Sequence, residues 1–204
     1  MSSSAQSVPT AGAVEAGEVL KRSYSVLLKD VAVRAGIFGG LFLAAAGLQQ
    51  VWDSALTAVL LVPPAAVGLV LLVFRLPSTL FAMARCRRVL RHYPLEFRPG
   101  ADMKSRVRGK FGTVFTLRVK EHQPGRSPLM RAVGARLRNN WPDGAEDGVW
   151  VAGDLPFGGV VFAPGGDALL LIQPAKWEKL APEREQAGAD RNARAAQARI
   201  AKQF

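Results

Sequence analysis

The stretch SALTAVLLVPPAAVGLVLLVFR, residues 54–75, carries no charge before its final arginine. The 20 uncharged residues from Ala55 to Phe74, at roughly 1.5 Å rise per residue, match a hydrocarbon core about 30 Å thick. Pro63 and Pro64 would break a helix in water, whereas a membrane helix tolerates them when neighbouring helices satisfy the freed carbonyls. The stretch therefore predicts a kinked transmembrane helix, with the Arg75 side chain extending to the membrane interface.

A second apolar run, from Ala35 to Trp52, precedes this one, and the polar segment QQVWDS (49–54) joins the two. Asp53 is the only charged residue between Ala35 and Phe74. We therefore predict a transmembrane hairpin over residues 35–75. A buried hairpin in a soluble protein is the weaker alternative, because 204 residues offer little protein to cover two such runs. A secretory signal peptide is also disfavoured, because a long segment precedes the first run and a second run follows it at once.

The formal net charge of +11 is unevenly distributed along the chain. Residues 75–140 carry 16 basic and 3 acidic residues, a net charge of +13. Because Lys and Arg flank the hairpin but are absent from its loop, the positive-inside rule predicts a multi-pass plasma-membrane protein with both termini in the cytoplasm. We expect residues 1–15, rich in Ser and Ala, to be disordered, and residues 16–34 to form a juxtamembrane helix. The single cysteine, Cys86, excludes an intrachain disulfide and fits a reducing compartment.

Small residues recur at intervals of four in the first apolar run, at Gly36, Gly40 and Ala44. Such residues let a second helix approach closely. One interpretation is a face for helix packing between two copies of the chain in a homo-oligomer. The other, which we favour, is packing against the second helix of the same hairpin.

Residues 76–93 have the spacing of a basic amphipathic helix. Its apolar side consists of Met83, Cys86, Val89, Leu90 and Tyr93. Its basic side carries Arg85, Arg87, Arg88 and Arg91, the predicted contacts for lipid or another polyanion. An anionic inner leaflet would attract each arginine by about 1 kcal/mol. Alternatively, the helix extends the second span and packs its apolar side on the following domain; the sequence favours neither interpretation.

Residues 94–180 predict a small β-rich cytoplasmic domain. In KFGTVFTLRVK (110–120), apolar and basic residues alternate with the period of a half-buried strand. SPLMRAVGARLRNN (127–140) has a Ser-Pro start and apolar residues at helical spacing, which predict a short helix. Three further strand-like runs follow between residues 148 and 173. The predicted fold class is thus a membrane α-helical hairpin of two transmembrane helices plus a small α+β domain with a curved antiparallel sheet, ending in a charged, Ala-rich tail helix over 181–204.

The glycine-rich stretch GVWVAGDLPFGGVVFAPGG, residues 148–166, is read as a β-hairpin whose turn is shaped by Asp154 and Pro156. It lacks the lysine of a phosphate-binding loop and connects two strands instead of a strand and a helix. The stretch and the following LLIQPAKWEKLAPERE resemble a motif of uncharacterised actinobacterial membrane proteins with two predicted membrane helices. This resemblance implies location and architecture, and it implies no catalytic residue.

No segment has the spacing of a known catalytic or metal-binding motif, so we expect no enzymatic activity, no cofactor and no metal. The favoured function is a non-enzymatic membrane protein that displays a basic β-rich domain as an adaptor or assembly module. Its predicted partners are anionic inner-leaflet lipid or an unidentified protein. The alternative is a membrane-tethered nucleic-acid-binding protein, since a basic segment attracts any polyanion. This alternative is less favoured, because Phe111 and Phe115 share the predicted buried face of their strand, where they cannot stack on bases.

Overall fold

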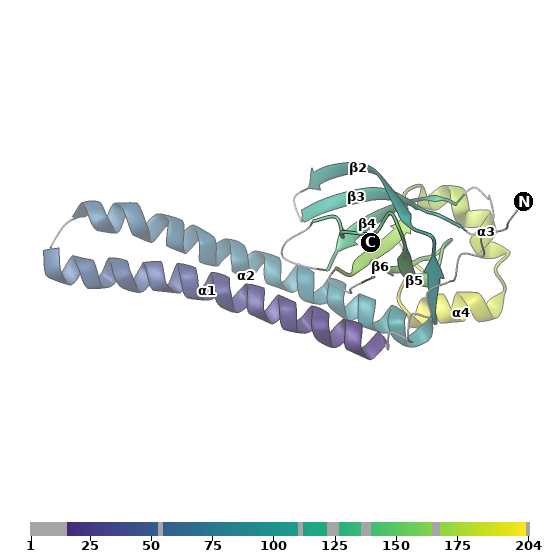
Figure 1. Cartoon of the computed structure of the whole chain (residues 1–204), viewed down its shortest axis with the longest axis horizontal. Helices are drawn as coiled ribbons and strands as arrows, with labels where there is room; N and C mark the ends of the chain where they lie inside the picture. The colour runs from purple at the N-terminus through teal and green to yellow at the C-terminus, as the bar shows by residue number, and fades with distance from the viewer. Residues whose placement is uncertain are drawn as a thin grey trace, which may run out of the picture.

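The computed structural model describes residues 16–52, 55–109, 112–121, 127–135, 140–164 and 168–202. Two long antiparallel helices, α1 (Ala16–Trp52) and α2 (Ala55–His92), lie side by side as a hairpin. A separate β-sheet domain packs along the second half of α2, and the hairpin tip extends far beyond it (Figure 1). The predicted combination of a helical hairpin and an antiparallel sheet domain is therefore confirmed. The predicted disordered segment 1–15 lies outside the described residues.

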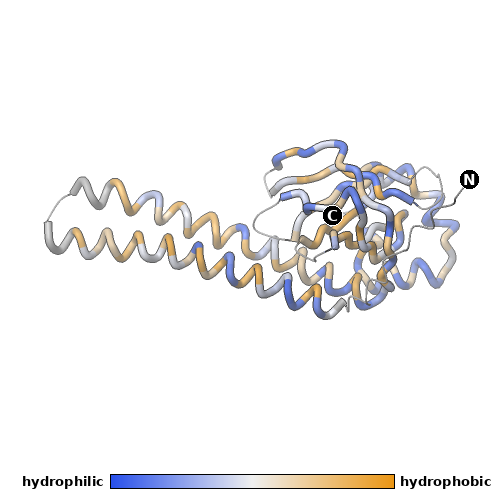
Figure 2. The backbone as a smooth tube through the Cα atoms, in the orientation of Figure 1, coloured by the Kyte–Doolittle hydropathy of each residue, from blue (hydrophilic) through white to orange (hydrophobic). Residues whose placement is uncertain are grey.

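Each helix is continuous over more of the chain than the predicted segments. α1 contains both the predicted juxtamembrane helix and the first apolar run, and α2 runs through Pro63, Pro64 and Pro77 into the predicted amphipathic helix. By length and composition, both helices can span a membrane. Their most apolar windows are only 6% and 11% buried, so the protein itself does not cover them as it covers a core helix. Figure 2 shows the apolar residues along the outer half of the hairpin.

The sheet has seven antiparallel strands in the order β1-β5-β6-β7-β4-β3-β2 and is open, with β1 and β2 at its edges. The strands are β1 (Leu95–Arg98), β2 (Ala101–Gly109), β3 (Gly112–Val119), β4 (Leu129–Gly134), β5 (Val149–Asp154), β6 (Gly158–Phe162) and β7 (Leu170–Pro174). The residues of β6 and β7 are all buried, which agrees with their mostly apolar sequences. Neither β1 nor β2 was predicted from the sequence. In β2, charged residues alternate with small or apolar residues, and residues 103–108 are all exposed because the strand lies at the edge of the sheet.

The predicted helix over 127–140 is wrong for its described part. Residues 129–134 form β4, which pairs with β3 on one side and β7 on the other. Met130 and Ala132 are buried while Arg131 between them is exposed, so the segment follows a period of two. Leu129 and Val133 are also compatible with a helical period. The segment forms a strand because it can pair with β3 on one side and with β7 on the other.

The last turns of α2 lie in the hydrophobic core of the domain. Met83, Cys86 and Val89 are fully buried in one apolar cluster with side chains of β6 and the β7 region, such as Phe162 and Leu169. Val19 and Leu27 of α1 and Leu72 of α2 continue this cluster along the hairpin. The hairpin and the domain therefore share one core, and α2 connects them without a flexible linker.

The chain ends in the 3₁₀ helix η1 (Trp177–Leu180) and two short helices, α3 (Ala181–Glu185) and α4 (Ala189–Gln197). This differs from the single tail helix predicted over 181–204. Gly188, with a φ of 83°, separates the two helices, a backbone conformation that glycine adopts at little cost. Ala195, Ala198 and Ile200 are buried in the cluster around α2, so this part of the tail belongs to the domain.

Candidate anion-binding grooves on the last turns of α2

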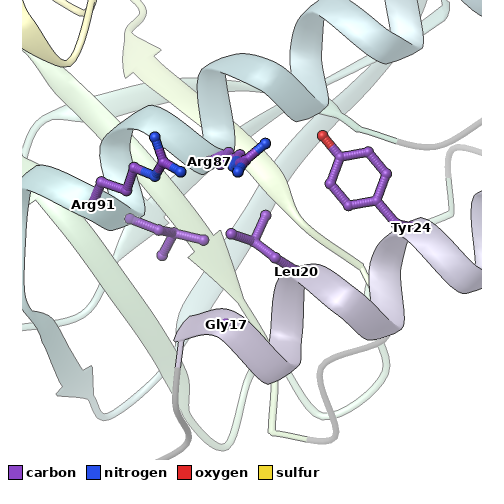
Figure 3. A pocket seen from close by; sticks show the side chains of 6 residues that line it. Gly17, Leu20, Tyr24, Arg87 and Arg91 are labelled. Carbon is purple, nitrogen blue, oxygen red and sulfur yellow. The ribbon is translucent and has the colours of Figure 1, made fainter.

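The structure divides the four arginines of the predicted basic helix between different sides of α2. Arg87 and Arg91 line a groove of about 430 Å³ with Leu90 and three residues of α1, namely Gly17, Leu20 and Tyr24 (Figure 3). Arg85 lines a second groove, of about 280 Å³, with Ala196, Arg199, Ala201 and Lys202 near the end of the chain. Arg88 is half-buried and lines neither groove. The four arginines therefore do not form one continuous surface.

The first groove combines an apolar floor with two cations. Leu20 of α1 and Leu90 of α2 line it, and a Cβ atom added at Gly17 would meet no atom within 4 Å. Figure 3 shows Arg87 and Arg91 one turn apart on α2, with the Tyr24 hydroxyl directed toward that helix. In the described part of the chain, neither guanidinium forms an ion pair. Because two like charges four residues apart repel each other, an anion that bridges them is favoured, and a guanidinium binds carboxylate or phosphate through two parallel hydrogen bonds.

The apolar side of the basic helix is buried against the domain and the first turns of α1. Met83, Cys86, Val89, Leu90 and Tyr93 are all buried. Of the two interpretations of this segment, the structure thus shows the second: the helix extends α2 and packs its apolar side on the domain. Burial also raises the pKa of the Cys86 thiol to about 12, so this cysteine is protonated and is no nucleophile at neutral pH.

Gly36, Gly40 and Ala44 lie on the outside of the hairpin. A side chain added at Gly36 or Gly40 would meet no atom within 4 Å, and Ala44 is exposed. The interpretation that these glycines pack against α2 is therefore wrong, and packing between two copies of the chain stays a prediction. The close approach of the two helices occurs instead at Gly68 of α2, where a Cβ atom would overlap the ring of Phe38.

Sequence reasoning missed an ion pair that attaches the tail to the glycine-rich hairpin. Asp154, at the end of β5, accepts two hydrogen bonds from the Arg191 guanidinium of α4, at 2.8 and 2.7 Å. Arg184 stacks on Trp177, with 3.9 Å from its guanidinium carbon to the ring centroid, and donates to the Pro156 carbonyl oxygen at 3.2 Å. The hydrogen-bond partners Arg184 and Pro156 lie 28 residues apart, and Arg191 and Asp154 lie 37 apart, so no local sequence pattern predicts these two contacts.

Two further ionisable residues near these elements have structural or solvent-exposed positions. Asp154 is engaged by Arg191, and His92 is exposed at the end of α2. In the part of the chain that the structure describes, no three His, Cys, Asp or Glu side chains gather as metal ligands. Phe115 is fully buried in β3, so it offers no surface for base stacking, and Phe111 lies outside the described residues.

The chain matches no family model, no curated protein and no solved structure in the three comparisons. The resemblance to two-helix actinobacterial membrane proteins therefore stays a prediction. The residues that carry this resemblance form the β5–β6 hairpin, as predicted, and Asp154 accepts a hydrogen bond from the backbone N–H of Phe157 across the turn. In the described structure, Asp154 connects the β5–β6 hairpin with α4 of the tail.

Proposed function

We propose that this chain is a non-enzymatic integral membrane protein whose hairpin anchors a basic β-rich domain at the cytoplasmic face of the plasma membrane, as an adaptor for a protein partner. One observation carries the proposal. The outer halves of α1 and α2 expose large apolar side chains along their length, including Ile37, Leu43, Leu60, Val73 and Phe74. A soluble monomer rarely exposes such an extended apolar surface, whereas a bilayer covers it.

The arrangement of the domain supports a position directly below the membrane. β2 ends and β3 begins on the side of the domain that faces the hairpin tip (Figure 1). Lys104, Arg106 and Arg108 of β2 are exposed, so this edge strand presents cations near the level where the apolar part of the hairpin ends. Anionic inner-leaflet lipid would attract this edge, by about 1 kcal/mol for each basic residue near the surface.

The groove with Arg87 and Arg91 suits a soluble partner better than lipid. These residues lie 12 and 16 positions beyond Arg75, where the second apolar run ends. At roughly 1.5 Å per residue, this places them about 18 and 24 Å from the end of the run, outside an interfacial layer that is only about 5–8 Å thick. An acidic protein segment with an apolar side chain beside its carboxylates would match the two guanidinia and the leucine floor.

Photocrosslinking from this groove tests the adaptor proposal. A photoreactive phenylalanine derivative in place of Tyr24 is expected to capture one protein partner in intact cells. The charge reversals Arg87→Glu and Arg91→Glu together should reduce the adduct at least about tenfold, which corresponds to about 1.4 kcal/mol. The matched control carries Arg118→Glu and Arg131→Glu on exposed positions of β3 and β4 and should keep the adduct. No adduct, or equal loss in both variants, would contradict the proposal; a nuclease-sensitive adduct would support the nucleic-acid alternative.

The orientation of the hairpin has a separate test. A reporter that is active only outside the cytoplasmic membrane should be silent when fused after Phe204 and active when inserted in the polar segment QQVWDS (49–54). The reason is that Lys and Arg flank the two apolar runs at their other ends and are absent from this segment. The measurement is enzyme activity per amount of fusion protein. Activity of the fusion at Phe204 would overturn the proposed cytoplasmic position of the domain.

A further inference from the structure

A third groove lies between α1 and α2 where their apolar runs end. Arg34 and Phe38 of α1 line it together with Gly68, Leu71, Leu72 and Arg75 of α2, and its volume is about 190 Å³. Arg34 directly precedes the apolar run 35–52, and Arg75 directly follows the uncharged run 55–74. At roughly 1.5 Å per residue these runs are about 27 and 30 Å long, so the two arginines lie at one level, at the same end of the apolar hairpin.

The lining of this groove is apolar apart from its two cations. Because Gly68 has no side chain, the Phe38 ring of α1 packs directly against α2 at this point. Leu71 is exposed beside it. In the described residues, the side chains of Arg34 and Arg75 form no hydrogen bond or ion pair, although they come from different helices and face the same groove. Two cations without a counter-ion, next to an exposed apolar surface, favour a ligand that has both an anionic and an apolar part.

We propose that this groove binds one anionic phospholipid, with the headgroup phosphate between the guanidinia of Arg34 and Arg75 and the start of an acyl chain against Phe38 and Leu71. The inference rests on the proposed function, because it requires that the hairpin spans the membrane. The headgroup phosphate of a surrounding lipid lies at the level of both arginines, where the hydrocarbon core ends. Free phosphate matches only half of the site, because it offers nothing to the apolar floor.

Native mass spectrometry of the full chain in detergent, with added phosphatidylglycerol or phosphatidylcholine, tests this site. The wild type is expected to retain one phosphatidylglycerol and to release phosphatidylcholine. The double variant Arg34→Gln/Arg75→Gln should retain phosphatidylglycerol roughly tenfold or more weakly, because it loses both cations. The matched control Arg118→Gln/Arg131→Gln removes the same charge from exposed positions of β3 and β4 and should retain the lipid as the wild type does. Inorganic phosphate in excess should not displace the lipid.

Three results would overturn the lipid site: equal retention by Arg34→Gln/Arg75→Gln and the wild type, equal loss in the control variant, or displacement by inorganic phosphate. The variant Arg34→Lys/Arg75→Lys, which keeps both charges, should recover part of the retention and thereby separate charge from misfolding. Membrane fractionation of each variant distinguishes the two proposals. If the wild type and all variants stay in carbonate-washed membranes but the wild type retains no phosphatidylglycerol, only the lipid site is wrong. If the wild type is absent from these membranes, the membrane anchor is wrong and the lipid site with it.

Discussion

The double substitution Leu43→Asp/Val67→Asp is expected to abolish membrane integration. Both side chains lie near the middle of their apolar runs and are 73% and 57% exposed on the hairpin surface. An aspartate at the centre of a transmembrane helix costs about 2.5–3.5 kcal/mol, so the two together cost roughly 6 kcal/mol of insertion free energy. The measurement is the share of full-length chain that remains in the membrane pellet after a carbonate wash.

A matched control uses two exposed apolar side chains of the domain. Met103→Asp and Val107→Asp, both on edge strand β2, introduce the same charges outside the hairpin and should leave the chain in the pellet. If the surface around Leu43 and Val67 faced water instead of lipid, the two aspartates on these exposed helix positions would have little effect on stability. Undiminished retention of the Leu43→Asp/Val67→Asp chain in washed membranes would therefore show that this hairpin surface does not face lipid.

The substitution Gly153→Ala is expected to destabilise the β-domain by about 3 kcal/mol. Gly153 has a φ of 145°, a conformation that costs a residue with a side chain about 1–3 kcal/mol. Its added Cβ would also lie only 2.5 Å from the Gly158 carbonyl oxygen and 2.5 Å from the Gly159 Cα. Because both neighbours are backbone atoms of the paired strand β6, a side-chain rotation cannot relieve the overlap. Denaturant unfolding of the full chain in detergent, followed by tryptophan fluorescence, measures the loss.

Gly144→Ala is the control for this prediction. Gly144 has a φ of 74°, but a Cβ at this position meets no atom within 4 Å. Its substitution should therefore cost only about 1 kcal/mol, from backbone strain alone. Equal destabilisation by Gly153→Ala and Gly144→Ala would mean that the close contact between β5 and β6 does not constrain the hairpin.

Prediction from sequence was most accurate where one physical signal acts over many residues. The charge-free runs at 35–52 and 55–74 predicted two long helices, because length and hydropathy alone distinguish such runs. The strands around Val151, Val161 and Leu171 were recognised from continuous apolar residues between turn signals. β4 was taken for a helix, because six residues with Leu129 and Val133 fit either period and only strand pairing distinguishes them.

The role of the predicted site residues as contacts for lipid or another polyanion stays a prediction, and the structure shows only where these residues lie. The basic character of residues 85–91 follows from composition, and the structure confirms that Arg87 and Arg91 are exposed. Which arginines share a groove depends on α1 and on the tail, because Tyr24 and Arg199 come from segments distant in sequence. For the same reason, helical spacing suggested Gly36 and Gly40 as the packing face, while the close helix contact lies at Gly68, opposite Phe38.

The sequence by itself determined that this chain contains two uncharged apolar runs of membrane-spanning length followed by a basic, strand-rich segment. These properties depend only on the number and order of residues. An apolar run must have a minimum length to cross a bilayer, and attraction to anions requires basic residues. The tertiary structure alone decided that the apolar side of residues 83–93 packs on the sheet, and that Arg34 and Arg75 face one groove. Such contacts depend on how two helices cross and on which strands pair, and neither is encoded in the spacing of residues within one segment.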